Sequence, residues 1–176
     1  EAGKTYAFVG PTGGGKSTTA SLMSRLYDPT AGRVRFQGRD LRCLPHQERA
    51  DKIAFILQEP FLFEGSVMDN LRYGQPEDFD QAALERRGEA LRLGPVLEAL
   101  QALPEGLKTD TEHLSLGQKQ LIAFVRAVLK DPDLLILDEA TANIDTTTEA
   151  LLEQVLAGLP AHTTRVVIAH RLNTIE

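Results

Sequence analysis

Residues 5–27 read TYAFVGPTGGGKSTTASLMSRLY, and their pattern indicates the class of fold. A short apolar run at 5–9 leads into a glycine-rich turn, and a helical pattern then extends from Lys16 to Tyr27. Within it, residues 10–17 match G-x-x-x-x-G-K-[ST], a motif that binds phosphate when it joins a strand to a helix. This part of the chain therefore predicts a strand, a phosphate-binding loop and a helix in succession.

The residue types in this loop have chemical reasons. Gly13, Gly14 and Gly15 let consecutive N–H groups turn inward, and the helix from Lys16 adds the partial positive charge of its N-terminus. We expect Lys16 to reach the β- and γ-phosphates and Ser17 to ligate Mg²⁺. Alone, the motif indicates only a nucleotide phosphate site, which kinases, GTPases and many ATPases share. The predicted nucleotide-binding residues here are Gly10, Pro11, Thr12, Gly13, Gly14, Gly15, Lys16, Ser17 and Thr18.

Two adjacent acids follow another apolar run. Residues 134–137 read LLIL and are followed directly by Asp138 and Glu139. Such a run is typical of a parallel strand buried on both faces, whose carboxyl end borders the ligand crevice. We expect Asp138 to hold Mg²⁺ together with Ser17. Glu139 points elsewhere because side chains alternate along a strand, and it is suited to orient or deprotonate an attacking water.

Strand and helix patterns alternate along the rest of the chain. Strands are expected at 33–37, 52–57 and 166–169, and helices at 66–72, 79–88, 89–103, 115–130 and 147–159. Ser115 is expected to be an N-cap. The order of elements indicates the α/β class, with a parallel sheet and an inserted α-helical subdomain. We expect the core to comprise residues 1–58 and 131–176, and the helical subdomain residues 59–130.

Composition narrows the possible partners. The chain has 176 residues, 42% of them hydrophobic, which suffices for a sizeable core. A formal net charge of −6 provides no basic field for nucleic acid, so we expect no nucleic-acid partner. The lone Cys43 excludes an internal disulfide, and no apolar run approaches the ~20 residues that span a bilayer. Membrane association is therefore expected to come from a partner or a further segment.

Residues 114–118 read LSLGQ and carry a more specific resemblance. Together with the phosphate-binding loop and the paired acids, this loop resembles the Leu-Ser-Gly-Gly-Gln signature of ABC (ATP-binding cassette) nucleotide-binding domains. The resemblance covers essentially the whole chain and implies a P-loop NTPase core of the RecA-like kind. It also implies ATP and Mg²⁺ as cofactors, and ATP hydrolysis as the activity.

Further landmarks of the family match residue by residue. Gln58 resembles the Q-loop glutamine, which contacts Mg²⁺ or the water and senses the transmembrane partner. Asp145 resembles the D-loop aspartate, and His170 resembles the switch histidine that contacts the γ-phosphate. The resemblance thus implies Glu139, His170 and Gln58 as catalytic residues and Ser17, Gln58 and Asp138 as metal ligands. It further implies that Ser115, Gly117, Gln118 and Asp145 bind nucleotide.

Several segments are similar to exporter-type ABC domains, among them residues 58–74, ALPEG at 102–106 and HRLNTIE at 170–176. This similarity implies an ATPase that powers export of a drug, lipid or peptide from the cytoplasmic face of a membrane. The implied partners are a second nucleotide-binding domain, paired head to tail, and the coupling helices of a transmembrane domain. Phe61 and Phe63 are expected beside the groove for a coupling helix, or in the core of the helical subdomain.

Leu116 departs from the family pattern because it stands where the signature usually has glycine. In the family, each signature loop covers the γ-phosphate held by the other domain. A leucine adds bulk and restricts backbone dihedrals that glycine leaves open, so the site that this loop completes should be weakened. We expect one half of a heterodimeric exporter with one slow site. A symmetric homodimer that tolerates Leu116 remains the alternative.

Nine residues precede Gly10 and six follow His170. The family usually has more structure at both ends, so we expect the N- and C-terminal parts of the usual domain to be missing here. The aromatic residue that stacks on adenine is therefore not assigned, and Tyr6 is expected in the core. Two other functions stay open: a non-transport ATPase of this fold acting on nucleic acid or ribosomes, and a regulatory module that holds ATP without hydrolysis.

Overall fold

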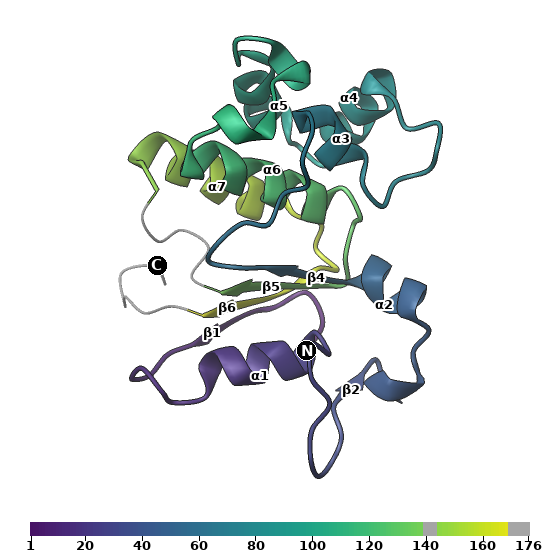
Figure 1. Cartoon of the computed structure of the whole chain (residues 1–176). Helices are drawn as coiled ribbons and strands as arrows, with labels where there is room; N and C mark the ends of the chain where they lie inside the picture. The colour runs from purple at the N-terminus through teal and green to yellow at the C-terminus, as the bar shows by residue number, and fades with distance from the viewer. Residues whose placement is uncertain (139–143, 169–176) are drawn as a thin grey trace.

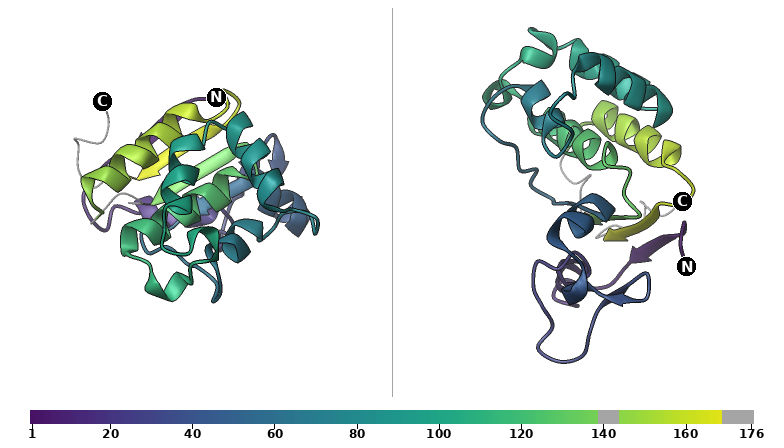
Figure 2. Two further views of the ribbon diagram at one scale, coloured as in Figure 1. Left: turned by 90° about the horizontal axis from the view of Figure 1, so that it is seen from above. Right: turned by 90° about the vertical axis from the view of Figure 1, so that its right-hand side faces the viewer.

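The computed structural model describes residues 1–138 and 144–168. Its described part is built in layers around a parallel β-sheet (Figure 1). Helix α1 (Lys16–Met23) lies below the sheet in that view, and α6 (Leu116–Val128) and α7 (Thr146–Gly158) lie above it. The helices α3 to α5 form a further layer beyond α6, which the two turned views also show (Figure 2).

The described sheet has the strand order β1-β6-β5-β4, and all neighbouring strands are parallel. Its strands are β1 (Thr5–Phe8), β4 (Ile53–Ile56), β5 (Leu134–Asp138) and β6 (Thr164–Ile168). Phe8 is in register with Ile168, and Ile168 with Asp138. The carboxyl ends of the strands therefore meet along one edge of the sheet, at the left in Figure 1.

Both faces of the central strand β5 are buried, as its apolar run predicted. Leu134 and Ile136 pack with Ala20 of α1 in the core below the sheet. Leu135 and Leu137 point to the opposite face and join the larger core formed with α6 and α7. The α/β class with a parallel sheet is thus confirmed.

Helices fill the segment between β4 and β5, as predicted. They are α3 (Val67–Arg72), α4 (Gln81–Ala90), α5 (Gly94–Gln101) and α6, with 3-10 turns at Gly106–Lys108 and Thr111–His113. Ser66 begins α3 with a capping box that includes Asp69, and Asp80 caps α4. Within the described ranges, no helix is long and apolar enough to cross a membrane.

Two local predictions are wrong, and one helix was missed. Helix α1 ends at Met23 and not at Tyr27, because Ser24 bonds back to the carbonyls of Ala20 and Ser21 and Arg25 has a φ of 55°. The strand expected at 33–37 is only β2 (Arg35–Phe36), which pairs with β3 (Arg39–Asp40) across two residues of positive φ. The short helix α2 (His46–Lys52) was not predicted.

The expectation that Tyr6 lies in the core is also wrong. β1 is an edge strand of the described sheet, and the Tyr6 side chain is exposed, with its hydroxyl bonded to the first residue, Glu1.

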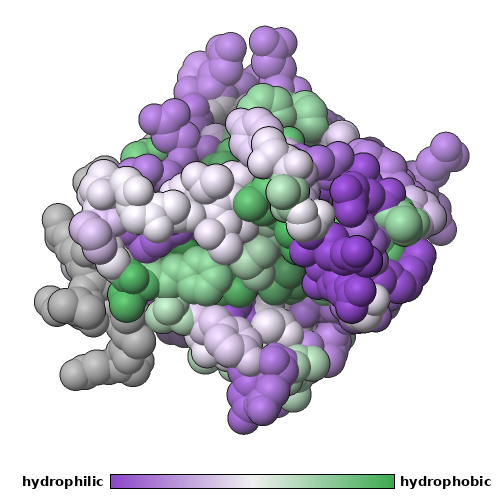
Figure 3. All heavy atoms as spheres, turned by 90° about the horizontal axis from the view of Figure 1, so that it is seen from below, coloured by the Kyte–Doolittle hydropathy of each residue, from purple (hydrophilic) through white to green (hydrophobic). Residues whose placement is uncertain are grey.

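The face that carries α1 shows a band of apolar surface across its centre, between polar regions (Figure 3). The described chain therefore exposes an apolar band on this face in addition to burying apolar side chains in its core.

Candidate nucleotide-binding site

The predicted site residues follow the carboxyl ends of the strands. Residues 10–15 follow β1, Gln58 follows β4, and Asp138 is the last residue of β5. Since these strand ends lie along one edge of the sheet, the fold gathers the phosphate-binding loop, Gln58 and Asp138 there. The predicted catalytic residues Glu139 and His170 lie outside the described residues.

Glycines give the phosphate-binding loop its backbone shape. Gly10, Gly13 and Gly15 have φ values of 151°, 82° and 81°, which side chains other than glycine rarely adopt. Gly15 is the N-cap of α1 and has no side chain with which to cap the helix. The first N–H groups of α1 therefore point into the loop without a side-chain acceptor, which is how a helix N-terminus binds an anion.

Lys16 lies across the mouth of this loop. Its Nζ donates to the carbonyl oxygens of Gly10 and Pro11, at 2.9 Å in each case. The side chain of the half-buried Lys16 thus runs back over the loop from the first turn of α1. Because a flexible ammonium donates up to three hydrogen bonds, it can exchange these carbonyls for phosphate oxygens without moving the helix.

Ser17 and Asp138 are brought together from distant parts of the chain. The Ser17 hydroxyl donates to Asp138 Oδ1 across 3.3 Å, where the start of α1 faces the end of β5. A hydroxyl and a carboxylate are the hard oxygen ligands that Mg²⁺ takes from a protein while it keeps several waters. The two side chains therefore fit a Mg²⁺ site at the sequence-predicted position. Among the described residues, no cluster of three or more acidic, histidine or cysteine side chains offers another metal site.

Gln58 is exposed, and the backbone beside it is tied to α6. Gln120 of α6 is only 1% exposed and donates from Nε2 to the carbonyl of Leu57, at 3.4 Å. The start of the Q-loop is thus joined to the helix that also begins at the signature loop. Gln120 was not predicted, because its signal in the sequence is merely a polar residue on the apolar face of a helix.

The signature loop, residues 114–118, leads directly into α6. Ser115 is the N-cap, as predicted, and forms a reciprocal capping box with Gln118. The Gln118 N–H donates to Ser115 Oγ at 3.2 Å, and the Ser115 N–H donates to Gln118 Oε1 at 2.9 Å. The exposed Ser115 hydroxyl therefore keeps its own proton free to donate, at the N-terminus of a long helix.

Leu116 occupies the first helical position of α6. It is not among the residues of positive φ, so this helical conformation needs no backbone dihedral that a leucine disfavours. Its side chain is 46% exposed and stands beside Ser115 on the surface. What separates Leu116 from glycine is therefore apolar bulk at the mouth of the loop, without strain in the helix.

Asp145 is the N-cap of α7. Its carboxylate accepts the Thr148 N–H at 2.9 Å and the Thr148 hydroxyl at 2.7 Å. The Thr148 N–H, followed by the Thr148 hydroxyl, lowers the pKa of the Asp145 carboxyl from its ordinary value. Both carboxylate oxygens are thus used within the chain, and Gly117 of the signature loop lies against them.

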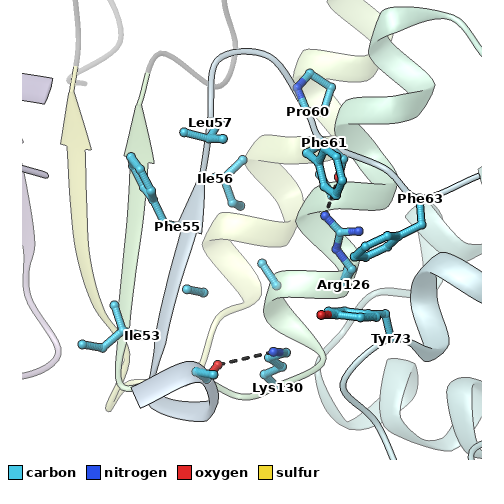
Figure 4. Close-up of a pocket in the computed structure, with 14 residues that line it drawn as sticks. Ile53, Phe55, Ile56, Leu57, Pro60, Phe61, Phe63, Tyr73, Arg126 and Lys130 are labelled. Carbon is cyan, nitrogen blue, oxygen red and sulfur yellow. Dashed lines mark hydrogen bonds between the residues drawn. The ribbon is translucent and has the colours of Figure 1, made fainter. Parts of the chain in front are cut away.

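A pocket of about 330 Å³ opens between β4, the loop after it and α6. Phe61, Phe63 and Tyr73 line it, and Phe61 is 61% exposed, so the expectation of an exposed aromatic groove holds over the alternative of a core position. The rings of Phe61 and Phe63 meet edge to face at 5.1 Å, and those of Phe63 and Tyr73 lie 4.4 Å apart. Figure 4 shows these three side chains gathered around Arg126.

Arg126 of α6 holds this aromatic loop. Its guanidinium donates to the Phe61 carbonyl and to Asn70 Oδ1, and it lies 5.6 Å from the centre of the Phe63 ring. Burial lowers the pKa of the Arg126 guanidinium from its ordinary value. The fully buried Asn70 exchanges hydrogen bonds with both Phe63 backbone groups. The roles of Arg126 and Asn70 were not predicted, because nothing in the local sequence indicates that either residue contacts the aromatic loop.

The ABC transporter family model matches residues 1–142, which is most of the chain. The chain belongs to the ABC transporter family. The match includes the phosphate-binding loop, Gln58, the signature loop and Asp138. ATP-binding domains of this family bind ATP and are ATPases.

Relatives of this ABC domain are similar over nearly its whole length. The uncharacterized ABC transporter ATP-binding protein YfiC of Bacillus subtilis is 44% identical over 99% of the chain. The fatty acid ABC transporter ATP-binding/permease protein of Mycobacterium tuberculosis is 40% identical over 100% of it. The mitochondrial potassium channel ATP-binding subunit of Homo sapiens is 44% identical over 99%. The chain spans 29%, 28% and 24% of these proteins' own lengths.

A solved structure of a bacterial Atm1-family ABC exporter with ATP bound superimposes on this ABC domain with a TM-score of 0.83. The two are 34% identical, and the match covers 99% of this chain and 30% of the other. The P-loop NTPase fold is thereby confirmed, and the chain is an ATP-binding domain of the exporter type. ABC exporters work as dimers together with transmembrane domains.

Proposed function

We propose that this ABC domain binds and hydrolyses MgATP as part of a larger exporter, and that hydrolysis powers export of a drug, lipid or peptide. The observation that carries the proposal is the meeting of Ser17 with Asp138 beside a glycine loop whose helix has no side-chain cap. This arrangement provides anion-binding N–H groups, a mobile cation at Lys16 and two hard oxygen ligands at one point of the fold. The exporter-type relatives support the coupling to transport.

Each residue then has a separate task. Lys16 neutralises charge on the β- and γ-phosphates, while Ser17, Asp138 and Gln58 hold Mg²⁺ and its water shell. Glu139 orients and deprotonates the attacking water, a role worth about 10²–10⁴-fold in rate. His170 donates one ring N–H to a γ-phosphate oxygen. Bound Mg²⁺ supplies neutralisation of the charge that develops on the phosphates.

We also propose that the domain works in a head-to-tail pair with a second ABC domain, at the cytoplasmic face of a membrane. The signature loop would then bind the γ-phosphate of ATP held by the partner, through the Ser115 hydroxyl and the N-terminus of α6. Leu116 puts apolar bulk where that phosphate has to approach, while Lys16, Ser17 and Asp138 are in place. An unequal, heterodimeric pair follows: one hydrolytic site on this chain, and one slow site on its partner.

The aromatic pocket beside β4 is the proposed contact with the transmembrane part. Phe61, Phe63 and Tyr73 offer exposed apolar surface that a short amphipathic helix can cover. Among the residues that the structure describes, the same pocket is lined by the cations Arg126 and Lys130 and by no acidic side chain, which favours a helix that presents a carboxylate or its own carboxyl end. Because Arg126 and Gln120 tie this region to α6, movement of the docked helix would reach the signature loop.

Nucleotide binding by the full-length protein tests the proposal. Lys16→Ala should abolish detectable ATP hydrolysis and weaken ATP binding, while Lys4→Ala, which removes an exposed lysine before β1, should leave both unchanged. Equal hydrolysis by the two variants would contradict the assignment. Stimulation of turnover by RNA or DNA, in place of lipid or a transport substrate, would instead favour an ATPase that acts on nucleic acid.

A further inference from the structure

Helix α6, which begins at the signature loop, and helix α7, which Asp145 caps, pack against each other, and one of their contacts is made by a glycine. Gly117, in the first turn of α6, is buried against the N-terminal cap of α7, and the two helices lie side by side above the sheet (Figures 1 and 2). A Cβ at Gly117 would lie 2.8 Å from Thr148 Oγ1 and 3.0 Å from Asp145 Oδ2. It would also lie 3.3 Å from Thr148 Cγ2. A side chain on Gly117 would thus force Thr148 and Asp145 to shift.

Thr148 makes two kinds of contact at this point. Its N–H and its hydroxyl hold the two carboxylate oxygens of Asp145. Its hydroxyl and methyl groups also form the surface on which Gly117 packs. One side chain therefore sets both the orientation of the Asp145 carboxylate and the distance between the α6 and α7 termini.

The turn around Asp145 is fixed in the core on either side. Ile144 packs against the larger hydrophobic cluster, and Thr148 and Leu152 are 7% and 0% exposed. A turn held at both ends cannot easily retreat from an enlarged Gly117, because interiors are closely packed. An enlarged Gly117 would therefore press on Thr148, whose side chain is buried.

We propose that Thr148 is a positioning residue that joins the D-loop aspartate to the signature loop, so that residues 114–118 and 144–148 move as one unit. Asp145 then acts through the position of this unit, because its carboxylate is committed to Thr148 and as an anion is a poor ligand for phosphate oxygens. The contacts among Gly117, Asp145 and Thr148 are all made within one chain and need no partner. Its effect on turnover rests on the proposed ATPase function.

The experiment compares Gly117→Ala, Thr148→Ala and the double variant in the full-length protein. Hydrogen exchange at residues 114–118 and ATP turnover are measured for each. Gly117→Ala is expected to speed exchange about tenfold, because the added methyl displaces the Thr148 contact. Turnover is expected to fall about tenfold or more, since small misplacements near reacting groups cost up to about 10²-fold.

Suppression is the decisive result. Thr148→Ala removes both Oγ1 and Cγ2, so the double variant should recover most of the exchange protection that Gly117→Ala loses. Thr148→Ser keeps the hydroxyl and should give no such recovery. Gly94→Ala is the matched control, since a Cβ there meets nothing within 4 Å. If Gly117→Ala prevents folding, the yields of folded protein are compared instead, and a higher yield of the double variant than of Gly117→Ala alone is the expected result.

The outcomes separate the two proposals. If the double variant recovers the exchange protection, the role proposed for Thr148 is supported, whatever the ATP turnover. If the unmodified protein shows no ATP turnover at all, only the proposed ATPase function is contradicted. Additive defects, or a Gly117→Ala variant that exchanges like the unmodified protein, would overturn the role of Thr148.

Discussion

Ser17 Oγ donates to Asp138 Oδ1 across 3.3 Å, although the two residues are 121 positions apart in the sequence. The contact joins the first turn of α1 to the carboxyl end of β5. It exists because β1, which leads to α1, and β5 flank the same strand, β6, in a parallel sheet. The order of strands thus places a hydroxyl and a carboxylate where a cation bound to phosphates would lie.

Ser17→Ala should weaken binding of MgATP by about tenfold or more, because a ligand of a charged centre is worth about 1.5–3 kcal/mol. Binding of ATP in the presence of a chelator should change little. Ser24→Ala is the matched control, since within the described part of the chain its hydroxyl bonds only to the carbonyls of Ala20 and Ser21 in α1. Calorimetric titration of the full-length protein with and without Mg²⁺ checks this, and equal losses under both conditions would contradict the assignment.

Arg126→Leu should loosen the aromatic loop and uncouple it from α6. The variant leaves the Phe61 carbonyl and Asn70 Oδ1 without the charged donor, a loss of about 1.5–3 kcal/mol. Amide exchange at residues 59–65 should become about tenfold faster or more. Lys130→Met is the control, because Lys130 lines the same pocket and, as far as residues 1–138 and 144–168 show, donates only to the carbonyl of Ala50. Equal exchange in the two variants would show that Arg126 does not hold the loop.

Acid should destabilise the cap of α7. Because Thr148 lowers the pKa of Asp145, the folded state favours the carboxylate, and this contribution is present above the ordinary pKa of 3.8. It is lost as the pH falls through the lower, folded-state value. Asp145→Asn should therefore flatten the decline of the melting temperature below about pH 3.8, and it should also alter turnover.

Asp40 provides the comparison for this prediction. A hydrogen bond from the Arg42 side chain lowers the pKa of Asp40 to about 2, so its contribution is lost as the pH falls from 3.8 towards that value. Asp40→Asn should flatten the decline over this window without changing turnover, because Asp40 is the last residue of β3 and caps the 3-10 turn Leu41–Cys43, away from the predicted nucleotide-binding residues. If Asp145→Asn melts like the unmodified protein at every pH, the cap contributes nothing.

Leu116→Gly should leave hydrolysis at this chain's own site unchanged and raise turnover modestly at the partner's site. The reason is bulk, since Leu116 is helical and exposed and imposes no positive φ. Measuring turnover with the partner's own hydrolytic residue intact and disabled separates the two sites. An increase confined to this chain's site would contradict the head-to-tail arrangement.

Local patterns predicted much of the fold. The apolar run at 134–137 and the cap at Ser115 follow from side-chain chemistry within a few residues, and both were predicted. The premature end of α1 could not be predicted, because it depends on Ser24 and on a positive φ at Arg25. The boundaries of the helical subdomain at 59 and 130 stay a prediction.

The contacts that assemble the site were less accessible from sequence. Gly10–Lys16 spacing identifies the loop, and the shared Mg²⁺ role of Ser17 and Asp138 was predicted, but their direct hydrogen bond could be seen only in the structure. Thr148 and Gly117 lie on separate helices, and neither carries a local signal that they touch. The role proposed for Thr148 and Gly117 therefore follows from the packing of α7 against α6 and not from the local sequence.

Steady-state ATP turnover of the full-length protein with Glu139→Gln, assembled with its partner, measures whether this chain provides the hydrolytic site of the pair. Glu153→Gln, an exposed glutamate on α7, serves as the matched control. If this chain provides the hydrolytic site of an unequal pair, Glu139→Gln should lower turnover by about 10²–10⁴-fold while the control stays unchanged. Turnover near that of the unmodified protein would contradict the account.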